Sequence, residues 1–115
     1  MRSLSVGFAT IVDFDDKPAI LRCSGDEDRS TQVGRRSALV RAFRSQSDVI
    51  VDLSGLVFAD ASLMLDLATL ARRLRAHGAA ILLRGAQPQI RTLIELVGLH
   101  RLPGVRFDAP PPALV

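Results

Sequence analysis

One segment most constrains the fold of this chain, a leucine-rich helical pattern lying between two short apolar runs. Leucines recur from Leu63 to Leu74 at spacings of four, three and four, which predicts a helix with one buried face. Asp48 to Leu53 precedes it and Ala79 to Leu83 follows it, and both runs are too short and too apolar for anything but buried strands. A strand, a long helical crossover and a second strand predict parallel pairing with a right-handed connection. We expect the first of these strands to be covered on both faces.

The N-terminal part predicts a hairpin and a first helix. Leu4 to Val12 and Pro18 to Ser24 are short apolar segments, and the acidic stretch from Asp13 to Lys17 between them is typical of a turn. A helix is expected from Ser30 to about Arg44. Its core face is predicted to contain Val33, Leu39, Val40 and Phe43.

The C-terminal part predicts one more helix and a short strand. Pro88 suits a first helical turn, and Gly98 suits a left-handed end. The core face between them is expected to contain Ile90, Leu93, Ile94 and Val97. Val105 to Phe107 is expected to form a last strand. Together the elements predict an α/β fold: a mixed sheet with an N-terminal hairpin and parallel inner strands, covered by three or four helices. We expect one domain over residues 1–107 and a proline-rich, mobile tail over residues 108–115.

Composition excludes several classes of function. The 115 residues are 48% hydrophobic and 23% charged, as in a single globular domain. The net charge of +3 comes with 4% aromatic residues, and no basic cluster is interleaved with aromatics, so nucleic acid is not an expected partner. No apolar run is long enough to cross a bilayer, so we expect a cytoplasmic protein without direct membrane insertion. The single cysteine, Cys23, is expected in the core.

Chemistry-bearing motifs are few. There is no glycine-rich phosphate loop and no Cys/His cluster at metal-site spacing, so no cofactor and no metal are expected. A small enzyme using Asp60 and His77 is a weak alternative, because the sequence supplies neither a nucleophile nor a cofactor for them.

The outward side of the leucine helix carries the candidate site. Ala61, Leu65 and Ala68 lie opposite the leucines, beside Thr69 and Arg72. This stripe fits a docking surface for another protein, and it equally fits the single apolar residues that are common on any surface.

The ordered combination of these segments resembles the STAS domains, the family of the bacterial anti-sigma factor antagonists. The resemblance is carried by DVIVDLSGLVFADASLMLDLATLARRLRAHGAAILLRGAQPQIRTLIELVGL, and it extends over roughly Leu4 to Phe107. Within it, Phe58, Ala59 and Asp60 match the end of the family's loop before the second helix. Upstream, the turn ending at Asp28 is similar to the family's Gly-Glu-Leu-Asp turn.

The resemblance implies a protein-binding switch, with one departure. In the family, a serine directly after the loop aspartate accepts a phosphoryl group. Here Ala61 stands at that position and has no hydroxyl, while Ser62 is either a substitute acceptor or a helix-start residue. The resemblance together with the outward stripe predicts these partner-binding residues: Asp28, Asp60, Ala61, Ser62, Leu65, Ala68, Thr69 and Arg72.

Two readings of the function follow from the resemblance. In the first, the chain is a non-enzymatic regulator that docks on an anti-sigma factor with a serine kinase-like ATPase domain, or on another regulatory protein. In the second, it is an accessory subunit that binds the cytoplasmic ATPase of a lipid or anion transporter in the membrane.

Overall fold

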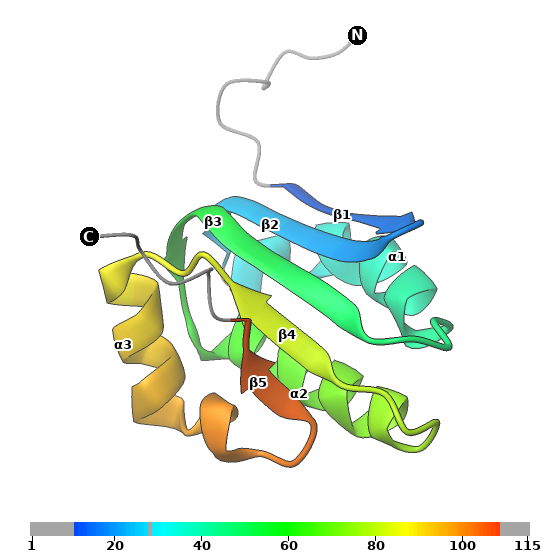
Figure 1. The fold of residues 1–115 in the computed structure, drawn as a ribbon. Coiled ribbons are helices and arrows are strands. Elements are labelled where there is room, and N and C mark those ends of the chain that lie inside the picture. Colours follow the sequence, from blue (N-terminus) through cyan, green and yellow to red (C-terminus); the bar gives the residue numbers. More distant parts are fainter. Residues whose placement is uncertain (1–10, 28, 109–115) are drawn as a thin grey trace, which may run out of the picture.

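A computed structural model describes residues 11–27 and 29–108 of the chain. Figure 1 shows a five-stranded sheet in the order β1-β2-β3-β4-β5. The strands are β1 (Ile11–Asp16), β2 (Ala19–Glu27), β3 (Val49–Ala59), β4 (Ile81–Arg84) and β5 (Val105–Phe107). The helices are α1 (Gln32–Phe43), α2 (Ala61–Arg75) and α3 (Pro88–Val97), with short 3-10 turns η2 (Arg29–Thr31) and η3 (Leu99–Arg101).

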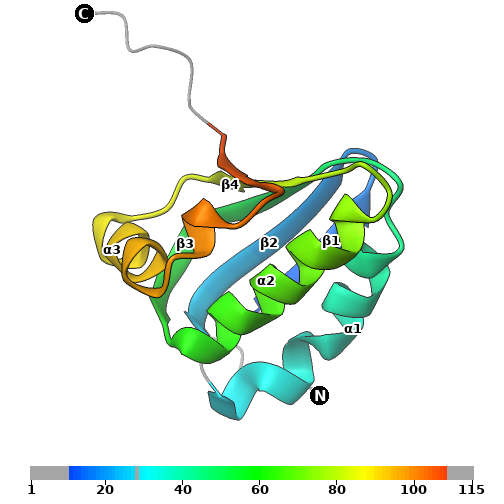
Figure 2. The same cartoon turned by 90° about the horizontal axis from the view of Figure 1, so that it is seen from below.

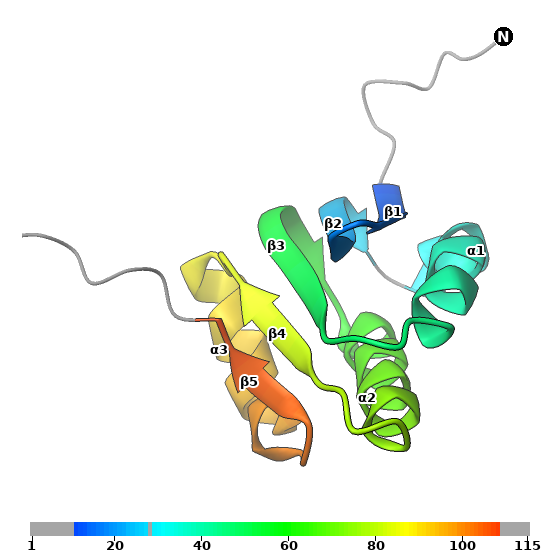
Figure 3. The same cartoon turned by 45° about the vertical axis from the view of Figure 1, so that its right-hand side comes forward.

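The strand pairing confirms the predicted mixed sheet. β1 and β2 form an antiparallel hairpin, whereas β2, β3, β4 and β5 run parallel to one another. Each parallel pair is joined through a helix, and successive right-handed crossovers between neighbouring strands bring their helices to the same face. Seen from that side, α1 and α2 lie next to each other across the sheet and α3 lies towards its far edge (Figure 2). Figure 3 shows the same layer from the side of α1.

Burial alternates along the central strands. Val49, Val51 and Leu53 are fully buried against the helices, whereas Ile50 faces the other way and is only half-buried. The registers place Ile20 and Leu82 beside Ile50 in a row across the sheet. The expectation that β3 is covered on both faces was therefore wrong. A continuous apolar run is compatible with a strand buried on both faces. It is equally compatible with a strand whose uncovered face packs against apolar side chains of the neighbouring strands.

Helix α2 is packed as its leucine pattern predicts. Its leucines at the predicted spacing are all 0% exposed, and Met64 and Ala71 join them in the core. Gly78, just beyond the helix, has a φ of +78°, a left-handed conformation that glycine adopts without strain and that ends a helix readily.

Helix α1 corrects the prediction of its core face. Val33 is 80% exposed and Val40 is also exposed, whereas Arg35 is only 1% exposed. The buried stripe consists of Arg35, Ala38, Leu39 and Ala42. The two alanines let α1 pack closely on the sheet, and two acidic partners compensate the charge of Arg35. The inward face of α1 therefore cannot be identified from its largest apolar side chains.

The hairpin also differs from the prediction. The acidic stretch belongs to strand β1, and the turn falls at Lys17 and Pro18. Phe14 points into the core, while Asp13 and Asp15 point outward and pair with Arg22 on β2 at 3.3 and 2.7 Å. Cross-strand pairing with an arginine makes these acids compatible with a strand. The part of the predicted first strand before Ile11 lies outside the described residues.

The C-terminal elements follow the prediction with one exception. Ile90 and Ile94 are buried and Leu93 packs against the core, but Val97 is 45% exposed. Gly98 ends α3 with a φ of +80°, as expected. The backbone amide of Asp108 donates to Leu83 O at 2.8 Å. Residues 109–115, most of the predicted mobile tail, lie outside the described residues.

Candidate protein-docking site

Asp60 fixes the start of helix α2. Strand β3 runs directly to Ala59, so the expected loop before the helix is replaced by the end of a strand. Asp60 has an extended backbone, and its Oδ1 accepts a hydrogen bond from the Ser62 amide at 2.8 Å. Its own amide donates to Glu27 O at the end of β2 at 3.0 Å. Asp60 is thus a helix N-cap that is tied to the neighbouring strand.

Ser62 is held by hydrogen bonds on both sides. Its hydroxyl donates to Asp60 Oδ1 at 2.6 Å and accepts from Arg35 Nη2 at 3.0 Å. The side chain is half-buried. Because the hydroxyl proton and one acceptor position are already used, these contacts favour a structural role at the helix start.

A buried arginine lies beneath this turn. Arg35 Nη1 forms an ion pair with Glu27 Oε1 at 3.0 Å, and both side chains are 1% exposed. Its Nε pairs with Asp66 Oδ2 at 2.8 Å, and Nη1 also donates to Thr31 Oγ1 at 3.3 Å. A guanidinium can serve several acceptors at once because its donors form a planar fork. The cluster therefore connects the end of β2, helix α1 and the first turns of α2.

The outward stripe of α2 is exposed at Ala61 and Leu65, as the sequence predicts, but only partly at Ala68. Leu65 is 67% exposed, and Ala61 and Arg72 are exposed too. Ala68 is half-buried and packs against the edge of the core. The hydroxyl of Thr69, also on this side, donates to Leu65 O at 3.1 Å within the helix.

An apolar hollow of about 220 Å³ lies beside this stripe. One wall comes from α2 and the other from the end of α3 and the segment after it. Val97 and Leu102 on the second wall are 45% and 38% exposed. The lining residues are Ala61, Met64, Leu65, Ala68, Val97, Gly98, Leu99 and Leu102. Exposed apolar side chains gathered around a hollow are more typical of a protein-docking surface than isolated ones.

The structure brings together most of the predicted site residues and adds others. The helix start and the stripe form one surface along α2, but Asp28 lies outside the described residues. Sequence reasoning missed Val97 and Leu102, because it assigned Val97 to the core and gave Leu102 no role. It also missed Arg35 and Glu27. Only the spacing of Arg35 from Ala38, Leu39 and Ala42 could have revealed an inward arginine.

The enzyme alternative has no geometric support. Asp60 caps the first turn of α2 and His77 lies beyond its last turn. A helix of 15 residues separates them by roughly 22 Å at a rise of about 1.5 Å per residue. Within the described residues, no group of three metal-ligating side chains gathers. No helix in the described part of the chain is long and apolar enough to span a membrane.

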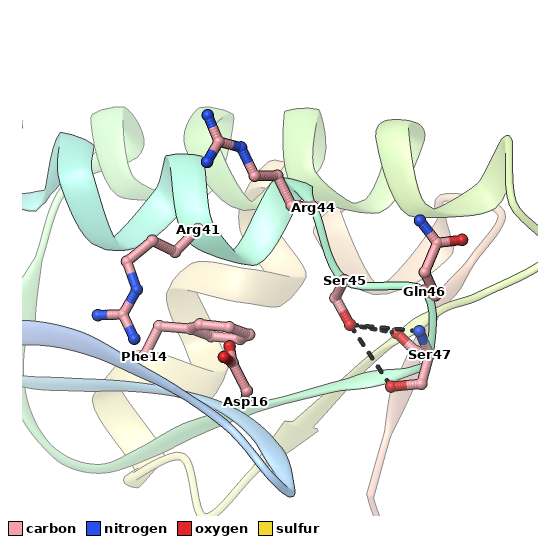
Figure 4. Close-up of a pocket in the computed structure, with 7 residues that line it drawn as sticks. All are labelled: Phe14, Asp16, Arg41, Arg44, Ser45, Gln46 and Ser47. Atoms are coloured by element: carbon pink, nitrogen blue, oxygen red, sulfur yellow. Dashed lines mark hydrogen bonds between the residues drawn. The ribbon is translucent and has the colours of Figure 1, made fainter.

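A second hollow, of about 430 Å³, lies between the hairpin and the end of α1 (Figure 4). Its lining residues are polar except for Phe14. Arg41 lies over the ring of Phe14 at 5.7 Å, and the Ser45 hydroxyl bonds the Ser47 carbonyl oxygen at 3.0 Å. This hollow lies at the C-terminal end of α1, whereas Ser62 contacts Arg35 near the N-terminal end of that helix. The hollow therefore does not extend the docking stripe.

A comparison with protein families finds one that matches most of the chain. The family described as "Mlab, STAS domain" matches residues 10–105. Among curated proteins, no sequence is similar enough to match.

Solved structures share the fold at low sequence identity. An anti-sigma-factor antagonist (STAS) domain protein from Planctomyces limnophilus is 13% identical with a TM-score of 0.72, over 88% of this chain and 91% of that one. The anti-sigma factor antagonist SpoIIAA in its unphosphorylated form is 19% identical with a TM-score of 0.62, over 89% and 90%. The murine anion transporter Slc26a9 is 18% identical with a TM-score of 0.62, over 79% of this chain but only 16% of the transporter.

Proposed function

The chain belongs to the STAS domain family, and from this premise we propose that it is a non-enzymatic, protein-binding regulator of the anti-sigma factor antagonist kind. It docks through the start and outward stripe of α2 onto an anti-sigma factor with a kinase-like ATPase domain, in the cytoplasm. The observation that carries the proposal is the exposed apolar stripe around Leu65, which adjoins a hollow and directly follows the Asp60 cap. Two relatives of the same fold, covered over most of their length, are described as anti-sigma factor antagonists.

The proposed docking site comprises the residues around this stripe. Leu65 and Ala68 supply apolar contact, and Arg72 lies at its rim. The full set is Asp28, Asp60, Ala61, Ser62, Leu65, Ala68, Thr69 and Arg72. Asp60 and Ser62 act by fixing the first turn of α2, since their polar atoms already bond each other.

Control by phosphorylation differs from the family pattern in this proposal. Ala61 is exposed at the start of α2 but has no hydroxyl to accept a phosphoryl group. Ser62 has its hydroxyl bonded to Asp60 and Arg35. The chain is therefore proposed to bind its partner without being switched off by a serine kinase.

A photo-crosslinking amino acid at position 65 tests the proposal in the native cytoplasm. We expect it to trap a protein with a kinase-like ATPase domain. Leu65→Arg should then weaken the affinity for that purified partner at least tenfold, because it would leave an unpaired charge in an apolar contact. A matched control is Thr92→Arg, on the exposed side of α3, which should bind normally. Unchanged affinity in a folded Leu65→Arg variant would remove this stripe from the interface.

The second candidate is an accessory subunit of a membrane transporter. It is favoured by the structural match to part of the anion transporter Slc26a9. The matched part makes up 16% of the transporter chain. In that case the crosslinked partner would be the cytoplasmic ATPase of a lipid or anion transporter. The same crosslink thus separates the two candidates.

A further inference from the structure

Three exposed arginines, Arg36, Arg44 and Arg73, gather where α1 and α2 lie next to each other. Helix α1 contains no acidic residue, its exposed side carries Arg36, and Arg44 follows as its C-cap, whereas Arg41 lies over Phe14 on the hairpin side. The net charge of +3 does not reveal this local positive charge, because acids elsewhere in the chain balance it. Asp13 and Asp15, for example, lie on the hairpin and pair with Arg22.

Helix α2 adds charge to the same surface. The guanidinium of Arg73 lies 4.6 Å from the ring centre of Phe43, which places it beside the end of α1. In residues 11–27 and 29–108, no ion pair joins Arg36, Arg44 or Arg73 to a carboxylate. Among the described residues that line the seam between the two helices, Asp66 is the carboxylate, and it is bound to the buried Arg35.

Apolar side chains lie between these arginines. Val33 is 80% and Val40 38% exposed, each within a helical turn of Arg36. A shallow groove of about 210 Å³ runs along the seam, lined in part by Leu39 and Phe43. Arginines clustered on one surface are attracted to the phosphates of an anionic membrane, and exposed valines beside them add apolar contact at the interface.

We propose that this basic face, formed by Val33, Arg36 and Val40 of α1, the C-cap Arg44 and Arg73 of α2, binds the surface of a membrane that contains anionic lipids. The guanidinium groups contact lipid phosphates, and the two valines reach the headgroup boundary. Nucleic acid fits less well, because α1 lies flat on the sheet and Phe43, the aromatic residue of α1, is partly buried under Arg73.

The basic face is separate from the proposed docking stripe. The hollow beside Leu65 lies on the side of α2 that faces α3, whereas Arg73 lies on the side that faces α1. A partner bound at Leu65 therefore leaves the basic face available to a membrane.

Vesicle sedimentation with the whole 115-residue chain tests this inference. The probes are vesicles of phosphatidylcholine with about one third phosphatidylglycerol, and vesicles of phosphatidylcholine alone. Each arginine near an anionic surface contributes about a fivefold increase in partitioning. We therefore expect binding to the anionic vesicles only, lost in high salt, and lowered at least tenfold by Arg36→Glu with Arg44→Glu. Val33→Ser with Val40→Ser should lower it by a smaller factor.

The control is Arg101→Glu with Arg106→Glu, two exposed arginines outside the basic face that give the same change of net charge. It should lower partitioning less than about threefold, with all variants checked for an unchanged thermal midpoint. An equal loss in the control would show that net charge alone acts and would overturn the proposal. Absence of binding to anionic vesicles would overturn it as well. So would tighter binding of a 20-base-pair DNA duplex, measured by fluorescence anisotropy in the same buffer.

Discussion

Arg35 on α1 donates a hydrogen bond to the Ser62 hydroxyl on α2 at 3.0 Å, across 27 positions of sequence. The same guanidinium pairs with Glu27 at the end of β2 and with Asp66 one turn further along α2. The first turn of the proposed docking helix is thus held in place by a charge that belongs to another helix. Changes on α1 are expected to reach the docking stripe through this contact.

Replacing the buried arginine tests that dependence. Arg35→Met keeps much of the side-chain volume but leaves Glu27 buried without its cation, and breaking a buried pair in this way costs about 3 to 5 kcal/mol. Urea unfolding followed by circular dichroism measures the loss. Arg35→Met combined with Glu27→Gln should be less destabilised than Arg35→Met alone, because the unpaired charge is removed. A loss below about 1 kcal/mol in the single variant would contradict the arrangement.

The two sides of α2 should respond differently to truncation. Leu67→Ala and Leu70→Ala each remove a fully buried side chain and should lower the free energy of unfolding by about 2 to 5 kcal/mol. Leu65→Ala, at an exposed position, should change it by less than about 0.5 kcal/mol. Equal effects at positions 65 and 67 would show that the helix is rotated relative to the structure described.

Removing the cap of α2 should have a moderate effect. Asp60→Ala loses the acceptor for the Ser62 amide and hydroxyl, and loss of an N-cap costs about 0.5 to 2 kcal/mol. Asp60→Asn, which keeps a side-chain oxygen, should retain most of the stability. If both variants unfolded at the same urea concentration as the parent chain, the side chain of Asp60 would not be acting as a cap.

Phosphorylation should depend on position 61. Incubation of the chain with its kinase-like partner and ATP should leave it unmodified, because Ala61 has no hydroxyl and Ser62 is bonded to Asp60 and Arg35. The Ala61→Ser variant restores a hydroxyl at an exposed position and should gain one phosphate, detected by mass spectrometry. Stoichiometric phosphate on Ser62 of the parent chain would instead make Ser62 the acceptor.

The buried thiol of Cys23 should make the folded chain less stable at alkaline pH. Its burial raises the pKa of the thiol from 9.0 to about 12. Between these values the unfolded chain gives up the proton and the folded chain keeps it, so the free energy of unfolding should fall as the pH rises from 9 towards 12. The slope should approach 1.4 kcal/mol per pH unit.

The control for this pH dependence is Cys23→Ala. The chain has no tyrosine and a single lysine, the exposed Lys17, so little else titrates in that range. The variant should be less stable at neutral pH, because it leaves a small cavity, but much flatter above pH 9. A parallel decline in both proteins would assign the alkaline loss to other groups.

The sequence by itself determined the parts of the fold that depend on local periodicity and chain geometry. Successive residues of a helix are rotated by about 100°, so the leucines of α2, spaced by three and four, all fall on its buried side. Gly98 adopts the left-handed conformation that ends α3. The strand, helix, strand order fixed the parallel pairing of β3 and β4. The exposed position of Leu65 followed from the same helical wheel.

Only the tertiary structure decided which side of α1 faces the sheet and what gathers at the start of α2. Arg35 is buried because Glu27 and Asp66, 8 and 31 residues away, meet it there, and this compensation outweighs the burial of Val33. The open side of the sheet and the hollow beside Leu65 arise from contacts between distant segments. No local pattern encodes such contacts, since the cost of burying a charge depends on partners that the folded chain alone brings within hydrogen-bonding distance.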